Sequence, residues 1–269
     1  MNPLPALPAF ARLPLTFDTA ALQAALDELP RQAWVPHFNS DYFSGEWSGI
    51  ALLAPATTNT PLLVGSQAER ATPTAALLDF PFWQSILDRF PAQLSSARLL
   101  RLGPGARIHE HCDPDLGHPN GDLRLHIPIR SHPAVEFILD GAAIPMQAGE
   151  CWFLDLSRPH RVENRSEHER VHLVLDCHRN AWLLEQIGAG LADTPPARPA
   201  LGAAQFAAFR ERVHADRALL QQLADIEDVG LFAEKTVELG AREGLHFSVD
   251  DVQAAMRQGR RSWTEQWVV

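Results

Sequence analysis

The sequence predicts an α+β protein in which an antiparallel β-sandwich or jelly roll lies between an N-terminal helical layer and a small C-terminal all-α domain. Three observations predict this class. Helical periodicity appears before residue 95, short alternating runs follow from about residue 96, and helical periodicity returns from residue 203. Consecutive short strands separated only by turns are typical of sandwiches and jelly rolls, not of βαβ units.

Two helical segments are predicted in the N-terminal region. The run TAALQAALDELP has the spacing of an amphipathic helix that stops at Pro30. The run AALLDFPFWQSILDRFP predicts a second helical stretch, interrupted near Pro81 and ended by Pro91. These segments form the expected helical layer.

The central region, about 96–178, is expected to form the strands. Its alternating runs are ARLLRL, DLRLHIPI, AVEFILD, ECWFLDL and RVHLVLD. The turn signals GPG, HPNG, DG and AGE separate them. Barrels of this kind bind ligands in their mouths.

The segment DTPPARPALG (193–202) is the predicted linker between a domain at 1–192 and a helical domain at 203–269. Beyond it, FAAFRERVHADRALLQQLADI and VGLFAEKTVELGAREG have apolar residues at helical spacing. A last helix is predicted to start at Ser248, with Asp251 at the capping-box position and Phe247 able to contact Val252.

Composition narrows the function classes. The formal net charge of −10 without a basic stripe argues against nucleic acid as the main partner. No apolar run is long enough to span a membrane, and MNPLPALPAFARLPL lacks the features of a signal peptide. The three cysteines fit no zinc spacing, so we expect free thiols in a reducing, cytoplasmic compartment.

The stretch RIHEHCDPD is the first candidate for chemistry. Residues i and i+2 of a strand point to the same face, so His111 and Asp113 are expected side by side. His160 follows after two predicted strands and the turn AGE. Two histidines and one carboxylate leave coordination positions open, which is the pattern of non-haem Fe(II) oxygenases. An H-x-D pair alone is weak support in a chain with 12 histidines.

Arg170 strengthens this interpretation. It lies ten residues after His160 and opens the strand RVHLVLD, where His172 and Val174 share its face. A guanidinium binds a carboxylate through two parallel hydrogen bonds, which a lysine cannot copy. A strand-edge arginine in an ordinary salt bridge is the competing interpretation.

Taken together, these motifs resemble the aspartyl/asparaginyl β-hydroxylase family of 2-oxoglutarate oxygenases, near the relatives that hydroxylate free proline. The resemblance covers roughly Gln32 to Asp176, about half of the chain. The segments that carry it are WVPHFNSDYFSGEW, LLRLGPGARIHEHCD, DLRLHIPI, AGECWFLDLSRPHRVEN and RVHLVLD.

The resemblance implies a double-stranded β-helix in which His111, Asp113 and His160 bind Fe(II). Asp113 places the chain nearer the proline-type branch, because the animal aspartyl hydroxylase branch lacks this carboxylate. The implied reaction converts the cosubstrate 2-oxoglutarate and O2 into succinate and CO2, and hydroxylates an unactivated C–H bond.

The resemblance also implies a cosubstrate pocket. Arg170 would bind the distal carboxylate of 2-oxoglutarate, while Arg124 and His126 match an R-x-H pair near its other end and the substrate. A polar sheet face is the alternative for this pair. The serine that assists the arginine in the animal branch aligns with Leu100, so another group must assist it here.

Two further segments carry weaker expectations. Four residues of the family's N-terminal motif are expected at the substrate entrance or in aromatic packing: Trp34, His37, Asn39 and Tyr42. Residues 203–262 resemble the helical leader-peptide-like domain associated with nitrogen-fixation gene clusters, which hints at a peptide or carrier-borne substrate. A helical cap or dimerisation module is the alternative.

The expected function is therefore a hydroxylase that acts on an amino acid, free or within a peptide, with a homodimer through the helical segments as one arrangement. One alternative is a cupin of other chemistry, because 109–111 (H-x-H) and 160–164 (H-x3-N) fit cupin spacing. Its ligands would include His109 and exclude Asp113, although Asp115 stands where a cupin has glutamate. The other alternative is a non-catalytic module that binds 2-oxoglutarate or another metabolite.

Overall fold

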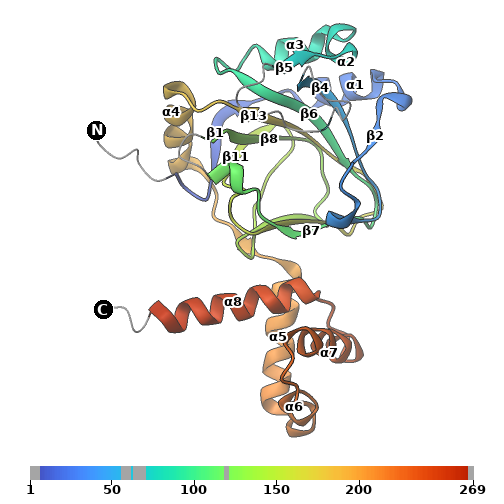
Figure 1. Ribbon diagram of the computed structural model, residues 1–269, viewed down its shortest axis with the longest axis vertical. Coiled ribbons are helices and arrows are strands. Elements are labelled where there is room, and N and C mark those ends of the chain that lie inside the picture. The colour runs from blue at the N-terminus through green and yellow to red at the C-terminus, as the bar shows by residue number, and fades with distance from the viewer. Residues whose placement is uncertain (1–6, 56–61, 63–70, 118–120, 266–269) are drawn as a thin grey trace. The chain divides into compact units, whose positions relative to one another are not determined.

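A computed structural model describes residues 7–55, 62, 71–117 and 121–265 (Figure 1). The predicted turn HPNG and the last four residues of the predicted helical domain lie largely outside this part of the chain. The chain forms two compact units, the first from Met1–Phe137 and Ile144–Pro196 and the second from Ile138–Ala143 and Ala197–Val269.

Eight consecutive strands form the core of two antiparallel sheets and alternate between them, except that β9 and β10 pair within one sheet. One sheet contains the order β11-β8-β13-β6 and the other the order β10-β9-β12-β7. This topology is a double-stranded β-helix, which confirms the predicted fold class. The strands are β6 (Leu94–Leu102), β7 (Arg107–His111), β8 (Leu123–Arg130), β9 (Val135–Leu139), β10 (Ala142–Ala143), β11 (Glu150–Leu154), β12 (His160–Asn164) and β13 (Arg170–Cys177).

Further strands extend both sheets. Two long strands, β1 and β4, come from the N-terminal region, for which the sequence predicted only helical and irregular structure. The run WSGIALLAP of β4 is apolar except for Ser48 and almost wholly buried, so it lacks the alternation by which a half-exposed strand is recognised. These strands are β1 (Phe10–Thr16), β2 (Val35–Pro36), β3 (Phe43–Ser44), β4 (Trp47–Pro55), β5 (Ala71–Pro73) and β14 (Arg198–Pro199).

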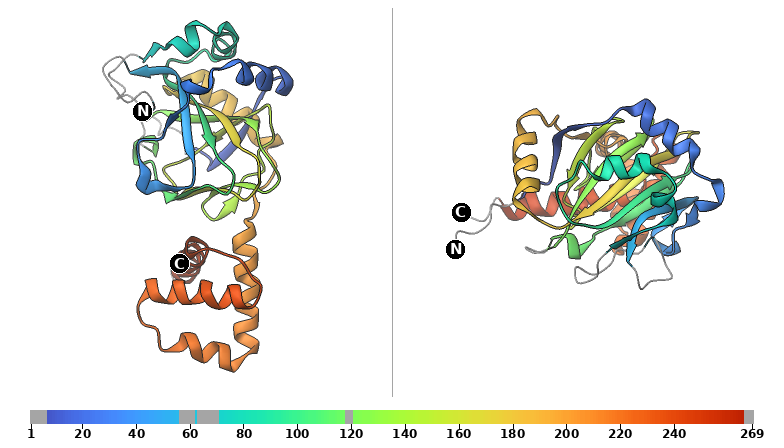
Figure 2. Two further views of the ribbon diagram at one scale, coloured as in Figure 1. Left: turned by 90° about the vertical axis from the view of Figure 1, so that its right-hand side faces the viewer. Right: turned by 90° about the horizontal axis from the view of Figure 1, so that it is seen from above.

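Helices pack on the outer side of the first sheet (Figure 2). Asp18 caps the first helix by accepting from two backbone N–H groups, and Pro81 occupies the first turn of the third. The helices are α1 (Thr19–Glu28), α2 (Ala75–Leu78), α3 (Pro81–Leu87) and α4 (Ala181–Gly190); short 3-10 turns are Arg31–Ala33, Ser40–Tyr42, Pro114–Gly117 and Leu191–Asp193.

The main hydrophobic core lies between these helices and the sheet. It joins Leu22 of α1, Trp83 of α3 and Ile187 of α4 to alternate residues of β13, such as Leu173. The other residues of β13 face the interior of the β-helix, and they include Arg170. The apolar outer face thus fixes which side chains point into the β-helix.

Four helices build most of the second unit. Asp216 ends the first helix and caps the second, so it divides the predicted helical run. Ser248 and Asp251 form the predicted capping box: the Ser248 N–H donates to Asp251 Oδ2 at 2.8 Å, and the Asp251 N–H donates to Ser248 Oγ at 3.3 Å. The helices are α5 (Leu201–Ala215), α6 (Arg217–Ala224), α7 (Val229–Arg242) and α8 (Val249–Glu265).

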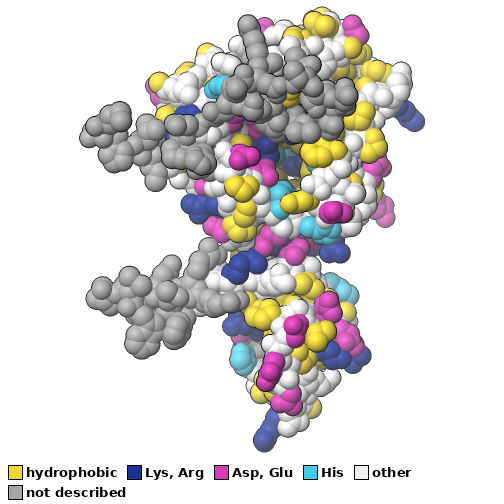
Figure 3. Space-filling model, viewed as in Figure 1, with side chains coloured by type: hydrophobic (Ala, Val, Ile, Leu, Met, Phe, Trp, Pro, Cys, Tyr) yellow, Lys and Arg dark blue, Asp and Glu magenta, His cyan; other side chains and the backbone are white. Residues whose placement is uncertain are grey.

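Charges of both signs are mixed on one face of the molecule (Figure 3). On the face drawn in Figure 3, basic side chains are scattered among acidic and apolar ones over the described residues. Within the same described part of the chain, none of the helices combines the length and apolar character needed to cross a bilayer.

Candidate active site

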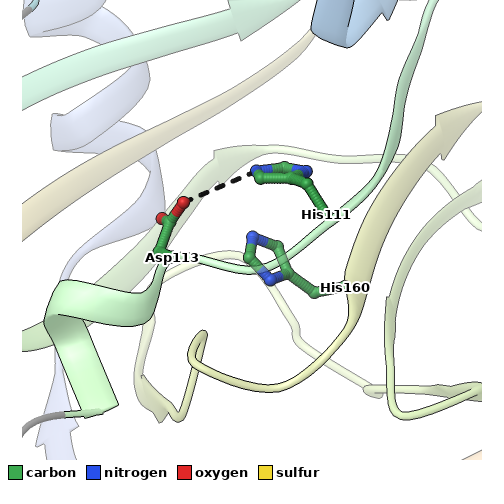
Figure 4. Close-up of side chains that lie close together, drawn as sticks. All are labelled: His111, Asp113 and His160. Atoms are coloured by element: carbon green, nitrogen blue, oxygen red, sulfur yellow. Dashed lines mark ion pairs between the residues drawn. The ribbon is translucent and has the colours of Figure 1, made fainter.

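The structure brings His111, Asp113 and His160 together (Figure 4). One possible ligand atom from each lies within 4.8 Å of the others. His111 ends β7 and His160 begins β12, and the two residues are register partners across this antiparallel pair. Asp113 follows β7 and is fixed by its N–H, which donates to the Leu156 carbonyl at 2.8 Å.

Both imidazoles present the same nitrogen to the centre of this group. The Nδ1 of His111 lies 2.8 Å from the His109 carbonyl, and the Nδ1 of His160 lies 3.0 Å from the Arg158 carbonyl. A carbonyl oxygen only accepts hydrogen bonds, so each Nδ1 carries the proton and each Nε2 keeps a free lone pair. Burial, and then the neighbouring His111, lowers the pKa of His160 to about 4, so its ring is neutral at pH 7.

This donor set fits a ferrous ion. Two neutral imidazoles and one carboxylate oxygen are ligands that Fe(II) accepts, and three protein ligands leave positions for cosubstrates. His111 Nε2 lies 3.7 Å from Asp113 Oδ1, so a single ion could contact both. His109 is not part of the group of possible ligands found among the described residues.

A buried ionic chain leads away from Asp113. Asp113 Oδ2 accepts from Arg124 Nη1 at 2.5 Å, and Arg124 Nε donates to Asp176 Oδ1 at 2.6 Å. Asp176 Oδ2 accepts from Arg98 Nη2 at 2.6 Å and from Ser96 Oγ at 2.5 Å. Burial alone would raise the pKa of the Asp176 carboxyl, but the two guanidinium groups hold it well below its usual range.

Asp176, Arg98 and Ser96 were not predicted as residues of the site. Asp176 lies six residues after Arg170 on the same strand, so the alternation of β13 already placed both on one face. A carboxylate at a buried position of that face was the available signal. No signal in the sequence pointed to its partners on β6, Arg98 and Ser96.

Arg170 is a buried cation without a carboxylate partner among the described residues. Its Nη2 lies 2.8 Å from His172 Nδ1, and its Nε makes no hydrogen bond. Burial lowers the pKa of Arg170 to about 9 and that of His172 well below its usual value, so His172 is neutral and accepts the hydrogen bond. His172 therefore assists Arg170 where Leu100, which lines the cavity nearby, cannot.

His126 is a second unsatisfied group in this region. Neither ring nitrogen has a hydrogen-bond partner, and burial followed by the charge of Arg170 lowers the pKa of His126 well below 6.5. Its ring centroid lies 5.7 Å from that of His172 and 5.3 Å from that of Phe137. Such an unpaired imidazole is poised to bond a polar ligand.

One cavity of about 860 Å³ connects these groups. His37 and Trp47 stack at its wall with ring centroids 3.5 Å apart, and Tyr42 lies edge-on to His111 at 5.2 Å. Asn39 also lines the cavity. Trp34 is not among the lining residues; it joins the packing beside the main core and lies 4.4 Å from the guanidinium of Arg101.

Comparison with known proteins finds a curated relative that is a proline hydroxylase. The L-proline cis-4-hydroxylase of Rhizobium meliloti (strain 1021) is 24% identical over 168 residues, which cover 62% of this chain and 59% of that protein. The match thus spans less than two thirds of the relative's length.

Solved structures with a related fold are more distant. A 2OG-Fe(II) oxygenase family oxidoreductase from Burkholderia pseudomallei is 15% identical, with a TM-score of 0.45 and coverage of 64% of this chain and 86% of that one. A prolyl-4-hydroxylase from Pseudomonas putida is 12% identical, with a TM-score of 0.41 and coverage of 64% and 94%. Both scores lie below 0.5, a likeness too loose to transfer any site.

The family model described as aspartyl/asparaginyl β-hydroxylase matches residues 21–180. This span is more than half of the 269 residues and contains the three possible metal ligands and Arg170. The chain therefore belongs to the aspartyl/asparaginyl β-hydroxylase family.

Proposed function

We propose that this protein is an Fe(II)- and 2-oxoglutarate-dependent hydroxylase that acts on an amino acid, free or within a peptide. Bound Fe(II) would supply the redox chemistry by which O2 oxidises 2-oxoglutarate and the substrate C–H bond. The chain supplies three ligands, His111, Asp113 and His160, together with a carboxylate anchor and a buried cavity.

The observation that carries this proposal is the unpaired guanidinium of Arg170 in the same cavity as the three possible ligands. An unpaired buried cation is costly to the fold, so its retention beside such a group indicates an anionic ligand. The distal carboxylate of 2-oxoglutarate matches it in charge and in its two-oxygen geometry.

Other residues in or beside the cavity have supporting roles. His172 orients Arg170 through its Nδ1, and His126 offers a further hydrogen bond to the cosubstrate. The predicted contact of Arg124 with the cosubstrate stays a prediction, since its guanidinium donates to Asp113 and Asp176. The residues His37, Asn39 and Tyr42 are proposed to border the substrate space.

The test measures 2-oxoglutarate binding to the Mn(II)-loaded protein by calorimetry, without O2 or turnover. Arg170→Ala removes two charge-assisted hydrogen bonds of about 1.5–3 kcal/mol each, so affinity should fall at least 100-fold. Arg130→Ala is the control, because Arg130 is paired with Asp27 and Glu169 and does not line the cavity. Unchanged binding by the Arg170 variant would refute the pocket assignment.

The substrate class has its own assay. Succinate release is measured with Fe(II), ascorbate and 2-oxoglutarate against free proline, aspartate, asparagine and candidate peptides. An amino-acid substrate should raise succinate release above the uncoupled background, with one hydroxylated product for each succinate. Tight 2-oxoglutarate binding without turnover of any substrate would favour the metabolite-binding alternative.

The setting of the protein is also proposed. None of Cys112, Cys151 and Cys177 forms a disulfide, which suits a reducing cytoplasm. A homodimer through the helices of the second unit, and a role of these helices in recognising a peptide or carrier, stay predictions. Size-exclusion chromatography with light scattering tests the dimer.

A further inference from the structure

We propose that Asp176 is a positioning residue of the metal centre: through Arg124 it orients the Asp113 carboxylate, so that Oδ1 faces the metal position while Oδ2 is held by a guanidinium. This inference rests on the proposed function, because it concerns the same metal ligand. It gives a role to a residue that touches neither metal nor substrate.

The register of the sheet places Asp176 for this role. Asp176 lies on the central strand β13, directly opposite Ser96 on β6 and Arg124 on β8. Its two oxygens accept hydrogen bonds from different strands: Oδ1 accepts from Arg124 Nε on β8, and Oδ2 accepts from Ser96 and Arg98 on β6. With no exposed surface and both oxygens bonded, the carboxylate has one orientation available.

The guanidinium transmits this orientation. Its nitrogens form a rigid planar fork, so fixing Nε on Asp176 also fixes the direction of Nη1 toward Asp113. Asp113 needs such support, since it lies beyond the end of β7 and its side chain is 29% exposed. With Arg124 on Oδ2, Asp113 offers a single oxygen to the metal, and the remaining coordination positions stay open.

The charge of Asp176 is a second reason why metal binding should depend on it. Two arginines and two aspartates balance within the chain Arg98–Asp176–Arg124–Asp113. Neutralising Asp176 leaves one net positive charge in a buried cluster next to the cation site. It also weakens the hold on Arg124, because an amide has one acceptor oxygen for the donors of Arg124, Arg98 and Ser96. Both effects weaken metal binding, and loss of groups that orient metal ligands typically lowers metal affinity about 10–100-fold.

The experiment compares Mn(II) binding by the full-length metal-free wild type and by D176N, measured from the EPR signal of free Mn(II). We expect about 10–100-fold weaker binding by D176N. E136Q is the matched control: Glu136 is a buried carboxylate paired with Arg165, and its neighbour Phe137 faces the cavity, so Glu136 points away. E136Q should bind Mn(II) within about twofold of the wild type, however much stability it loses.

A second variant separates positioning from folding. If D176N does not fold, R98M/D176N removes the arginine left unpaired and restores charge balance, yet Arg124 still lacks its carboxylate partner. We expect this double variant to fold and still bind Mn(II) at least about 10-fold more weakly. Wild-type affinity in either folded variant overturns the role of Asp176 alone. Absence of Mn(II) binding by the wild type overturns the proposed metal centre, and this inference with it.

Discussion

Arg170→Met should make the ligand-free protein more stable while abolishing 2-oxoglutarate binding. Burial lowers the pKa of Arg170 from 12.5 to about 9. At about 1.4 kcal/mol for each pH unit, keeping this group charged costs the fold about 5 kcal/mol. Methionine has a similar length, carries no charge and suits an apolar wall, so it removes this cost.

The net gain in stability from Arg170→Met is smaller than the full cost of burying the charge. The substitution leaves His172 Nδ1 without its donor, which costs about 1–3 kcal/mol. The difference is about 2–4 kcal/mol, so we expect a gain of at least about 2 kcal/mol, in line with replacements of buried charges by apolar residues. For a chain of this size the melting temperature should rise by about 4–8 °C.

The assay is chemical unfolding at pH 7 with and without 2-oxoglutarate on the Mn(II)-loaded protein. The ligand should stabilise the wild type and leave the variant unchanged. The free energy of unfolding of the wild type should increase as pH rises above 9, because the unfolded state then keeps the Arg170 proton that the folded state releases. The advantage of the variant should shrink accordingly.

Arg98→Met is the control, because Arg98 is also a buried arginine but is paired with Asp176. Removing it breaks a buried ion pair and should destabilise the protein by about 3–5 kcal/mol. A ligand-free Arg170→Met that is clearly less stable than the wild type would refute the claim that this guanidinium is held in the fold at a cost.

Three further predictions concern other sites. Burial lowers the pKa of His37 to about 4, so the protein loses stability as pH falls from 6.5 toward 4. His37→Phe should lessen this loss by about 1 kcal/mol, after allowing for the partial exposure of the ring, as measured by unfolding at several pH values. A Cβ at Gly240 would lie 2.4 Å from the Phe247 ring, so Gly240→Ala should destabilise the helical unit by about 1–3 kcal/mol. At Gly259 a Cβ would meet open space, so Gly259→Ala should stabilise α8 by up to about 1 kcal/mol. Thermal unfolding compares the two variants. Ser248→Ala removes the capping box and should cost about 1 kcal/mol in the same assay.

Much of the fold was predictable because its signals are local. The alternation of β6, β8 and β13 follows from one face meeting the helices and the other facing the cavity. Helix starts and stops at Asp18, Pro30 and Ser248 depend on neighbours within a few residues. Strands β1 and β4 were missed because β1 is defined by pairing with β11, which is distant in sequence, and β4 has no alternation.

The sequence by itself determined which groups are available to the site. The spacing of His111 and Asp113, the distal His160 and the arginine ten residues beyond it specify a possible ligand set and a possible anchor. These features depend on residue type and on the period of a strand, which are properties of short segments.

Only the tertiary structure decided how these groups can act. Two features depend on how different strands come together: among the described residues no carboxylate lies beside Arg170, and a chain of ion pairs runs from Asp113 through Arg124 to Asp176. Burial in the β-helix then sets their electrostatics, lowering the pKa of Arg170 and of His160. Hydrogen-bond partners and desolvation arise from residues that are distant in sequence and adjacent only after folding, so no short motif records them.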